Sequence, residues 1–423
     1  MTYKHTKEFA LIMDAKDPLC KFRDKFYLPS KDDGTPYIYL CGNSLGLQPK
    51  STKSALGQEL LDWQNLGVEG HFEAKTPWMP YHEFLTNAMA KVVGAKPIEV
   101  VVMNTLSVNL HLMMVSFFRP KGKRNKILIE FDAFPSDKYA VESQLKFHGI
   151  DPEEGLIQLK AREGEELIRI EDIEATINKH GDELALIMIG NTNYYTGQFF
   201  DMKRITSLGH KVGSKVGFDC AHGAGNVNLN LHDSGADFAV WCTYKYMNSG
   251  PGSLGGCFVH ERHAYDKTLP RFAGWWGHNK STRFKMRDGF DPIPGVEAWQ
   301  LSNPPILSMA AIMASLIIFE EAGMENLRKK AILLTGYLEY LVDQIPGSQI
   351  KIITPRDISQ RGSQLSLQMK NADKTLFDQI TKDGVIADWR EPDVIRIAPV
   401  ALYNSFEDVY SFVSILKKHL ATV

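Results

Sequence analysis

Short apolar runs alternate with helical patterns through the middle of the chain. Four of these runs are rich in apolar or β-branched residues, and each is followed by a loop of polar or small residues. Such runs are typical of buried parallel strands. The four predicted strands are Lys126–Glu130, Leu184–Ile189, Lys215–Asp219 and Asp237–Trp241. Strands that alternate with helices predict an α/β fold with a mostly parallel central sheet.

The carboxyl ends of these strands carry the most distinctive local sequences. The segments FPSD, NTNYYTG, DCAHGAGN and TYKYMNSGPG each follow one of the strands. Ligands of open α/β sheets bind outside the carboxyl ends of the strands, so the four segments predict one shared site. A helix is expected to begin near Asn104 or Thr105, where either side chain can cap it, and its N-terminus is suited to an anion.

The pattern changes after about Pro305, where long amphipathic helices and then short strands follow. The clearest helix is predicted over Arg328–Ile345, and a last one from about Ser405, where S-F-E-D resembles a capping box. The most apolar stretch, Ile306–Phe319, spans about 14 residues, whereas roughly 20 are needed to cross a bilayer. It therefore predicts a buried helix.

The length of the chain favours more than one domain, because 423 residues exceed one ordinary core. We expect an N-terminal segment over 1–50 that packs on the small domain. A large cofactor-binding domain is expected over 51–305, and a smaller C-terminal α/β domain over 306–423.

Charge and cysteine content narrow the possible partners. The net charge of −2 gives no basic footprint for nucleic acid, so a small-molecule ligand is expected. The five cysteines form no C-x-x-C pair, which predicts neither a disulfide framework nor a metal site. The first residues have scattered charges and no unbroken apolar segment, which is unlike a secretory signal. These features predict a cytoplasmic protein without membrane contact.

Asp219 and Lys245 are the residue types that a pyridine cofactor needs. Asp219 ends a predicted strand, and Lys245 follows the next strand, between two tyrosines and before a glycine-rich segment. A carboxylate can keep a pyridine nitrogen protonated, and an amine can form a Schiff base with an aldehyde and move protons. The chain has no G-x-x-x-x-G-K-[ST] loop and no G-x-G-x-x-G unit after an N-terminal strand, which disfavours nucleotides. The pattern therefore predicts pyridoxal 5′-phosphate on Lys245.

Each of these residues also has a purely structural interpretation. A lysine is usually a solvated surface residue, Asp219 could be a turn or cap residue, and His222 could be a hydrogen-bonded core histidine.

Ten segments of the chain resemble kynureninase. They are CGNSLGLQPK, GVEGHFEAKTPW, FPSDKYA, YYTGQ, FDCAHGAGN, YKYMNSGPG, GWWGH, RFKM, LSNPPIL and RIAPVALYNSFED. The resemblance spans nearly the whole chain. It implies fold type I of the pyridoxal-phosphate enzymes, in the aspartate aminotransferase superfamily, and a homodimer with active sites at the subunit interface.

The resemblance implies a set of residues around the cofactor. Lys245 matches the Schiff-base lysine, Tyr244 a tyrosine that binds phosphate and transfers protons, and Phe134 an aromatic residue stacked on the ring. Trp275 and Asn303 match residues that reach the phosphate region from the partner subunit. The full expected cofactor set is Leu106, Ser107, Phe134, Asp137, Asp219, His222, Tyr244, Lys245, Trp275 and Asn303.

The resemblance also implies a substrate site. Arg396 matches an arginine that binds the substrate α-carboxylate through two parallel hydrogen bonds. The alternation around it predicts an inward-pointing side chain, which needs an anionic partner, and the substrate could be that anion; a surface ion pair is the alternative. His71, Ser302 and Asn303 match polar groups that meet the ring hydroxyl of a 3-hydroxylated substrate, and Ser44 is also expected at the substrate.

The activity that the resemblance implies is hydrolysis of L-kynurenine or 3-hydroxy-L-kynurenine to anthranilate or 3-hydroxyanthranilate and L-alanine. This reaction belongs to tryptophan catabolism and NAD biosynthesis. One alternative is a cysteine desulfurase-like enzyme, which needs a cysteine on a late loop, whereas the last cysteine here is Cys257. The other is a non-catalytic protein that keeps the fold.

Overall fold

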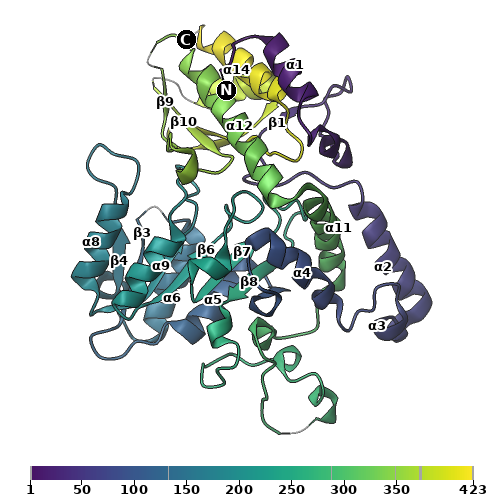
Figure 1. Ribbon diagram of the computed structural model, residues 1–423, viewed down its shortest axis with the longest axis vertical. Coiled ribbons are helices and arrows are strands. Elements are labelled where there is room, and N and C mark those ends of the chain that lie inside the picture. The colour runs from purple at the N-terminus through teal and green to yellow at the C-terminus, as the bar shows by residue number, and fades with distance from the viewer. Residues whose placement is uncertain (1, 132, 287, 348, 371–373, 422–423) are drawn as a thin grey trace.

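A seven-stranded sheet forms the centre of the computed structural model, which describes residues 2–131, 133–286, 288–347, 349–370 and 374–421 (Figure 1). Its strand order is β2-β8-β7-β6-β5-β3-β4. Neighbouring strands from β7 to β4 are parallel, whereas β8 runs antiparallel to β2 and β7. The strands are β2 Val100–Met103, β3 Lys126–Glu130, β4 Leu156–Leu159, β5 Leu184–Gly190, β6 Lys215–Asp219, β7 Phe238–Cys242 and β8 Gly255–Val259. The prediction of a mostly parallel sheet is confirmed.

The four strands expected from the apolar runs are all present in this sheet. β3 and β6 have the predicted bounds, β5 continues to Gly190, and β7 begins at Phe238 and ends at Cys242. Every residue of β7 is buried, as expected for a strand covered on both faces.

Successive side chains of each strand point to opposite faces of the sheet and join different cores. Leu128 belongs to the core beneath α4, α8, α9 and α11, and its neighbour Ile129 to the core beneath α5 and α6. The helices of this large unit are α2 Thr52–Leu66, α3 Gly70–Glu73, α4 Tyr81–Val93, α5 Leu106–Phe117, α6 Pro135–Phe147, α7 Pro152–Gly155, α8 Ile170–His180, α9 Met202–Lys211, α10 Leu231–Ser234 and α11 Ile306–Ala322.

A smaller unit at the top of Figure 1 combines the C-terminal part of the chain with its first residues. Its four-stranded antiparallel sheet has the order β12-β13-β10-β9, and β1 pairs in parallel with β11. The capping box predicted at Ser405 is confirmed, with reciprocal hydrogen bonds between Ser405 and Asp408. The elements are α1 Lys7–Ala15, β1 Ile38–Tyr39, α12 Met324–Asp343, β9 Ile350–Ile352, β10 Leu365–Met369, α13 Lys374–Lys382, β11 Val385–Ile386, β12 Asp388–Arg390, β13 Val394–Ile397 and α14 Phe406–Leu420.

The predicted boundary between the two domains lies directly before α11, which begins at Ile306. The domain boundaries stay a prediction. Met309 of α11 lies in the same core as α4, whereas Leu334 of α12 lies in the core of the small sheet, with Ala10 and Leu40. The helix expected over Ile306–Phe319 is present and mostly buried. Among the described helices no single one is long and apolar enough to span a membrane; α11 and α12 meet the length and composition criteria only together, and the pair is bent by 79°.

Candidate active site

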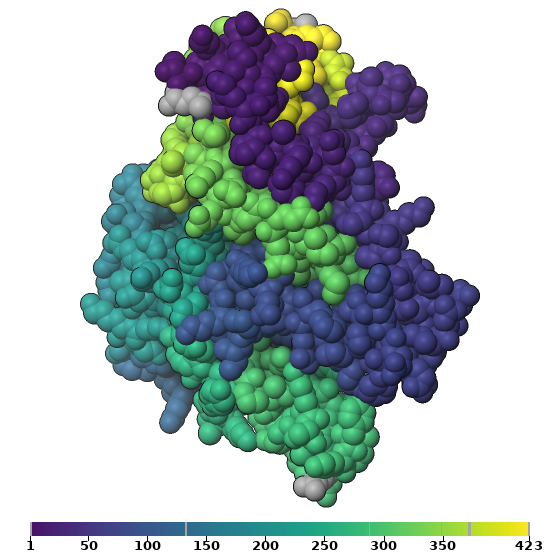
Figure 2. Space-filling view, turned by 45° about the vertical axis from the view of Figure 1, so that its right-hand side comes forward, coloured from purple at the N-terminus to yellow at the C-terminus, as the bar shows by residue number. Residues whose placement is uncertain are grey.

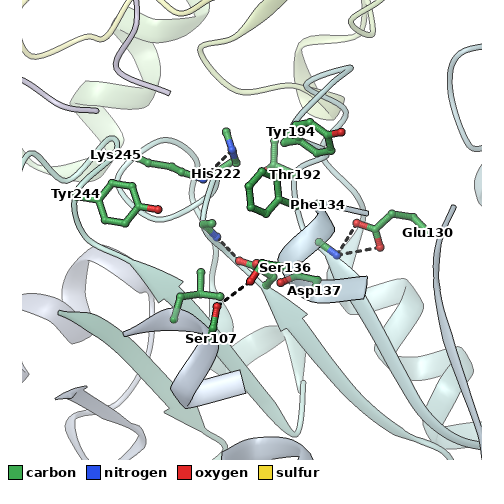
Figure 3. A pocket seen from close by; sticks show the side chains of 14 residues that line it. Ser107, Glu130, Phe134, Ser136, Asp137, Thr192, Tyr194, His222, Tyr244 and Lys245 are labelled. Atoms are coloured by element: carbon green, nitrogen blue, oxygen red, sulfur yellow. Dashed lines mark hydrogen bonds between the residues drawn. The ribbon is translucent and has the colours of Figure 1, made fainter. Parts of the chain in front are cut away.

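A cavity of about 130 Å³ lies at the carboxyl ends of the parallel strands (Figure 3). Segments after β3, β5, β6 and β7 line it, together with the first residues of α5 and α6. The lining residues are Leu106, Ser107, Glu130, Phe134, Ser136, Asp137, Gly190, Thr192, Tyr194, Asp219, Ala221, His222, Tyr244 and Lys245. All four segments expected to converge therefore contribute to one pocket.

Two helix N-termini bring hydroxyl groups to one side of this pocket. Ser107 in the first turn of α5 and Ser136 in the first turn of α6 lie 2.9 Å apart, Oγ to Oγ. The expected side-chain cap of α5 is wrong, because Thr105 makes no capping hydrogen bond and the Asn104 amide instead donates to Asn109 Oδ1 at 3.1 Å. Because the first N–H groups of a helix have no partner within the helix, the α5 terminus suits a phosphate.

Two buried carboxyl groups lie in the pocket. Asp137 and Asp219 are 5% and 7% exposed, and the Ala221 N–H donates to Asp219 Oδ1 at 2.6 Å. Burial raises the pKa of Asp137 well above its usual range, and the neighbouring Asp219 and Glu130 carboxyl groups raise it further. Burial also raises the pKa of Asp219, while a hydrogen bond from Asp137 opposes that shift. Asp137 is therefore the protonated partner and donates to the Asp219 carboxylate.

Lys245 faces this pair from the loop after β7. Its Nζ donates to His222 Nε2 at 3.0 Å (Figure 3). Burial lowers the pKa of His222 well below its usual range, and the positive charge of Lys245 adds to the shift, so His222 is neutral and can accept this bond. Burial raises the pKa of the neighbouring Tyr244 hydroxyl, which therefore stays protonated near pH 7.

These residues fit pyridoxal 5′-phosphate. The buried Asp137 Oδ1 has no hydrogen-bond partner among the described residues, so the pocket has an unused polar atom beside the Asp219 carboxylate. Lys245 Nζ lies 5.8 Å from the centroid of the Phe134 ring, which flanks the same space. A Cβ at Gly255 would come within 3.1 Å of the Leu106 nitrogen, so the glycine lets the α5 terminus lie close against the sheet.

Arg396 points inward as predicted but already has an anionic partner. It is 1% exposed; its Nε donates to Asp388 Oδ1 at 3.1 Å, and its Nη2 forms an ion pair with Asp388 Oδ2 at 2.7 Å. Its Nη1 donates to the Tyr194 carbonyl oxygen at 2.7 Å. Asp388 therefore supplies one anionic partner, and the substrate carboxylate stays a predicted second partner. Nη1 and Nη2 carry two N–H groups each, so each keeps a donor for a second carboxylate.

Arg396 and the other predicted residues lie outside the lining of this pocket. Ser44 lies in a turn whose Gly46 N–H donates to the Tyr244 carbonyl oxygen at 2.8 Å. His71 Nδ1 bonds to the Val68 carbonyl oxygen at 2.9 Å on α3. Ser302 and Asn303 are exposed, and Trp275 is 40% exposed. A single chain therefore brings together eight of the predicted residues: Leu106, Ser107, Phe134, Asp137, Asp219, His222, Tyr244 and Lys245.

Sequence reasoning did not single out Glu130, Ser136, Thr192 and Tyr194 as site residues. Each follows or ends a strand of the central sheet, which is the signal that could have found them. Glu130 is 3% exposed and accepts the Gly190 N–H at 3.0 Å. The Tyr194 ring packs edge-on against Phe134, with centroids 5.4 Å apart.

The cysteine that a desulfurase would need does not reach the pocket. Cys257 lies within β8, is fully buried, and burial raises the pKa of its thiol. A nucleophilic cysteine is instead a partly exposed thiolate.

Comparison with known proteins identifies the family of the chain. Residues 327–416 match the family model described as the kynureninase C-terminal domain. The chain is 57% identical over 417 residues to the kynureninase of Myxococcus xanthus, covering 99% of this chain and 98% of that protein. It is 48% identical to the kynureninase of Nematostella vectensis, covering 99% and 95%. Its fold is similar to that of the cysteine desulfurase CsdA of Escherichia coli, with a TM-score of 0.77, 15% identity and 96% and 99% coverage. The chain belongs to the kynureninase family of pyridoxal 5′-phosphate-dependent hydrolases, within fold type I.

Proposed function

We propose that the chain hydrolyses L-kynurenine or 3-hydroxy-L-kynurenine to anthranilate or 3-hydroxyanthranilate and L-alanine. One water is consumed, its hydroxyl joining the carbonyl carbon of the aryl product and its hydrogen appearing in alanine. The observation that carries the proposal is the meeting of Lys245, Asp219 and Tyr244 in one pocket of a kynureninase-family chain. The reaction serves tryptophan catabolism and NAD biosynthesis in this proposal, and the five unpaired thiols favour the cytoplasm as its place.

Each group of the pocket has a role in holding the cofactor. Lys245 would bind its aldehyde carbon, Asp219 its pyridine nitrogen, and Ser107 with the α5 terminus its phosphate, while Phe134 flanks the ring. When bound, the cofactor supplies an electron sink for the bond broken at the substrate α-carbon. Because Asp137 is neutral and donates to Asp219, it helps to keep the Asp219 carboxylate charged for this task.

The remaining chemistry belongs to side chains of this chain. The Lys245 amine is the base for the α-proton. Tyr244 keeps its hydroxyl proton because burial raises its pKa, so it can donate to the ketone oxygen when water adds to that carbon. The remaining N–H donors of Arg396 bind the substrate carboxylate and orient the α-carbon toward Lys245.

A homodimer would explain the predicted residues that lie away from the pocket. Large apolar side chains are exposed near them, including Phe72 at 62% next to His71, and Phe284 at 57% beside Trp275. The segment that carries Trp275 extends below the rest of the chain in Figure 2. Exposed patches of this kind mark protein interfaces. In this proposal Trp275, Asn303, Ser302 and His71 complete the pocket of the partner subunit.

The activity is tested by incubating holoenzyme with L-kynurenine and measuring anthranilate and alanine. Lys245→Ala should lower the rate by roughly 100- to 10,000-fold or more, whereas Lys211→Ala, at an exposed position on α9, should keep it. No alanine from the native enzyme, or an unchanged rate in Lys245→Ala, would overturn the proposal. Sulfide release from cysteine at a comparable rate would favour the desulfurase alternative.

The proposal that each pocket contains residues of both subunits is tested by mixing two variants. Lys245→Ala and Trp275→Ala should each be nearly inactive as homodimers. After subunit exchange, mixed dimers have one pocket with both native residues, so about a quarter of the native activity should return. No recovery in a mixture that has demonstrably exchanged subunits would show that each pocket takes both residues from one subunit, which contradicts the shared site.

A further inference from the structure

Glu99, His232 and His260 bring three possible metal ligands together far from the pocket. Glu99 directly precedes β2, His260 directly follows β8, and His232 lies in α10. Val100 pairs with Phe258, at the opposite end of this strand pair from the α5 terminus. The cluster therefore lies at the end of the central sheet that the proposed reaction does not use.

The donor atoms of the cluster are spaced as metal ligands are. His232 Nδ1 lies 2.9 Å and His260 Nδ1 3.8 Å from Glu99 Oε1, and one donor atom from each residue lies within 4.8 Å of the others. Two ligands of a tetrahedral zinc ion with bonds of 2.0–2.1 Å are separated by about 3.3 Å. The two printed distances lie on either side of this value, so small side-chain rotations suffice to seat an ion.

The charge of Glu99 gives an independent reason for a cation. Its side chain is fully buried, and backbone N–H groups of Lys96 and Glu261 donate to it at 2.9 and 2.8 Å. Among the described residues, the only side chains that form ion pairs with Glu99 are the two histidines. Lys96 Nζ pairs instead with Glu261, at 2.6 Å. A buried carboxylate is costly unless a cation accompanies it.

Two other carboxylates of the chain that contact histidines also have a lysine beside them. The buried Asp237 contacts two histidines, and Lys215 Nζ lies 3.2 Å from it. Glu297 contacts His82, and Lys280 Nζ lies 2.8 Å from it. Each of these two carboxylates thus has a lysine ammonium as a partner. Glu99 differs, because its ion-pair partners among the described residues are the two histidines alone.

We propose that Glu99, His232 and His260 form a binding site for one first-row divalent cation, such as Zn²⁺. Two imidazoles and one carboxylate suit such ions, whereas Mg²⁺ and Ca²⁺ prefer oxygen ligands. At His232 the ion takes the place of the proton on Nδ1, which moves to Nε2. At His260 it takes the place of the Arg262 backbone N–H, which now donates to Nδ1 at 3.2 Å. His232 is 28% exposed, which leaves an entry path and room for water as a further ligand.

The ion joins three segments that are distant in the sequence, so it stabilises the large unit and leaves the pocket untouched. An ion that binds only the folded chain raises its stability with concentration. At 100 times the dissociation constant, the midpoint of thermal unfolding should rise by about 3 to 5 °C.

The test is titration of metal-free holoenzyme with Co²⁺, followed by its visible d–d bands, and with Zn²⁺, followed by thermal unfolding. We expect one equivalent to bind without a thiolate charge-transfer band, and affinity to fall at least about 10-fold in His232→Asn and in His260→Asn. Glu83→Gln, in the cluster that already contains Lys280, should bind as the native enzyme does. Kynurenine hydrolysis should be the same in all three variants.

Three results would overturn the site: no binding, binding that both histidine variants retain, or binding that Glu83→Gln abolishes. If the more buried His260→Asn fails to fold, the partly exposed His232→Asn decides alone, with its folding checked by circular dichroism without metal.

Discussion

Replacement of Arg396 with lysine should weaken both the fold and the binding of substrate. The guanidinium makes one hydrogen bond and one close ion-pair contact to Asp388, and a hydrogen bond to the Tyr194 carbonyl oxygen, while an ammonium at the shorter reach of lysine can keep about one of these three contacts. Hydrogen bonds to charged groups contribute about 1.5–3 kcal/mol each, so the free energy of unfolding should fall by roughly 3 kcal/mol. Loss of one of two bonds to the substrate carboxylate should raise KM by roughly 10- to 150-fold.

Urea unfolding and steady-state kinetics with L-kynurenine measure these two effects. Arg390→Lys is the matched control, because Arg390 also binds Asp388, with its Nη2 donating to Asp388 Oδ2 at 3.2 Å, but its side chain is 36% exposed. An exposed pair of this kind contributes at most about 1 kcal/mol, and KM should change less than about 3-fold. The reasoning would be refuted by an unchanged KM in Arg396→Lys, or by equal changes in the two variants.

Three further predictions concern single side chains. In the cofactor-free enzyme the raised pKa keeps Asp137 protonated at pH values at which an unfolded aspartate is already ionised. The free energy of unfolding should therefore fall as pH rises above about 4, and Asp137→Asn should flatten this fall. The same pH dependence of the free energy of unfolding in both proteins, measured with urea at several pH values, would contradict it. Ser405→Ala removes the cap of α14 and should lower the free energy of unfolding by about 1 kcal/mol; a midpoint and slope equal to those of the native protein would argue against it. His71→Asn should change the ratio of kcat/KM for 3-hydroxykynurenine and kynurenine, and an unchanged ratio would remove His71 from substrate selection.

Local sequence was sufficient to place four of the seven strands of the central sheet and the segments that line the pocket. Continuous apolar runs such as Leu184–Ile189 can be buried on both faces only as inner strands, and the carboxyl ends of such parallel strands must meet at one edge. Asp219 and Lys245 could therefore be expected in one site before any distance was known. The roles of individual residues in that site came from the resemblance to a family.

Features that depend on strand register or on distant segments could not be predicted. Asp388 lies directly opposite Arg396 because β12 and β13 pair in one particular register, which the alternation around Arg396 does not reveal. The same holds for the Glu99 cluster, whose ligands come from three segments with no common motif. The prediction of a side-chain cap for α5 was wrong for a local reason. Asn104 adopts a positive φ of 48°, and its side chain donates to Asn109.

The central claim is that Lys245 holds the cofactor covalently, and reduction of the holoenzyme with borohydride tests it most directly. Reduction fixes the link between amine and aldehyde, and mass spectrometry of the digested protein then locates the pyridoxyl group. We predict this mass on the peptide that contains Lys245, between Tyr244 and Tyr246, and on no other lysine. A pyridoxyl group on a different lysine, or none on Lys245 in protein that turns over kynurenine, would contradict the account.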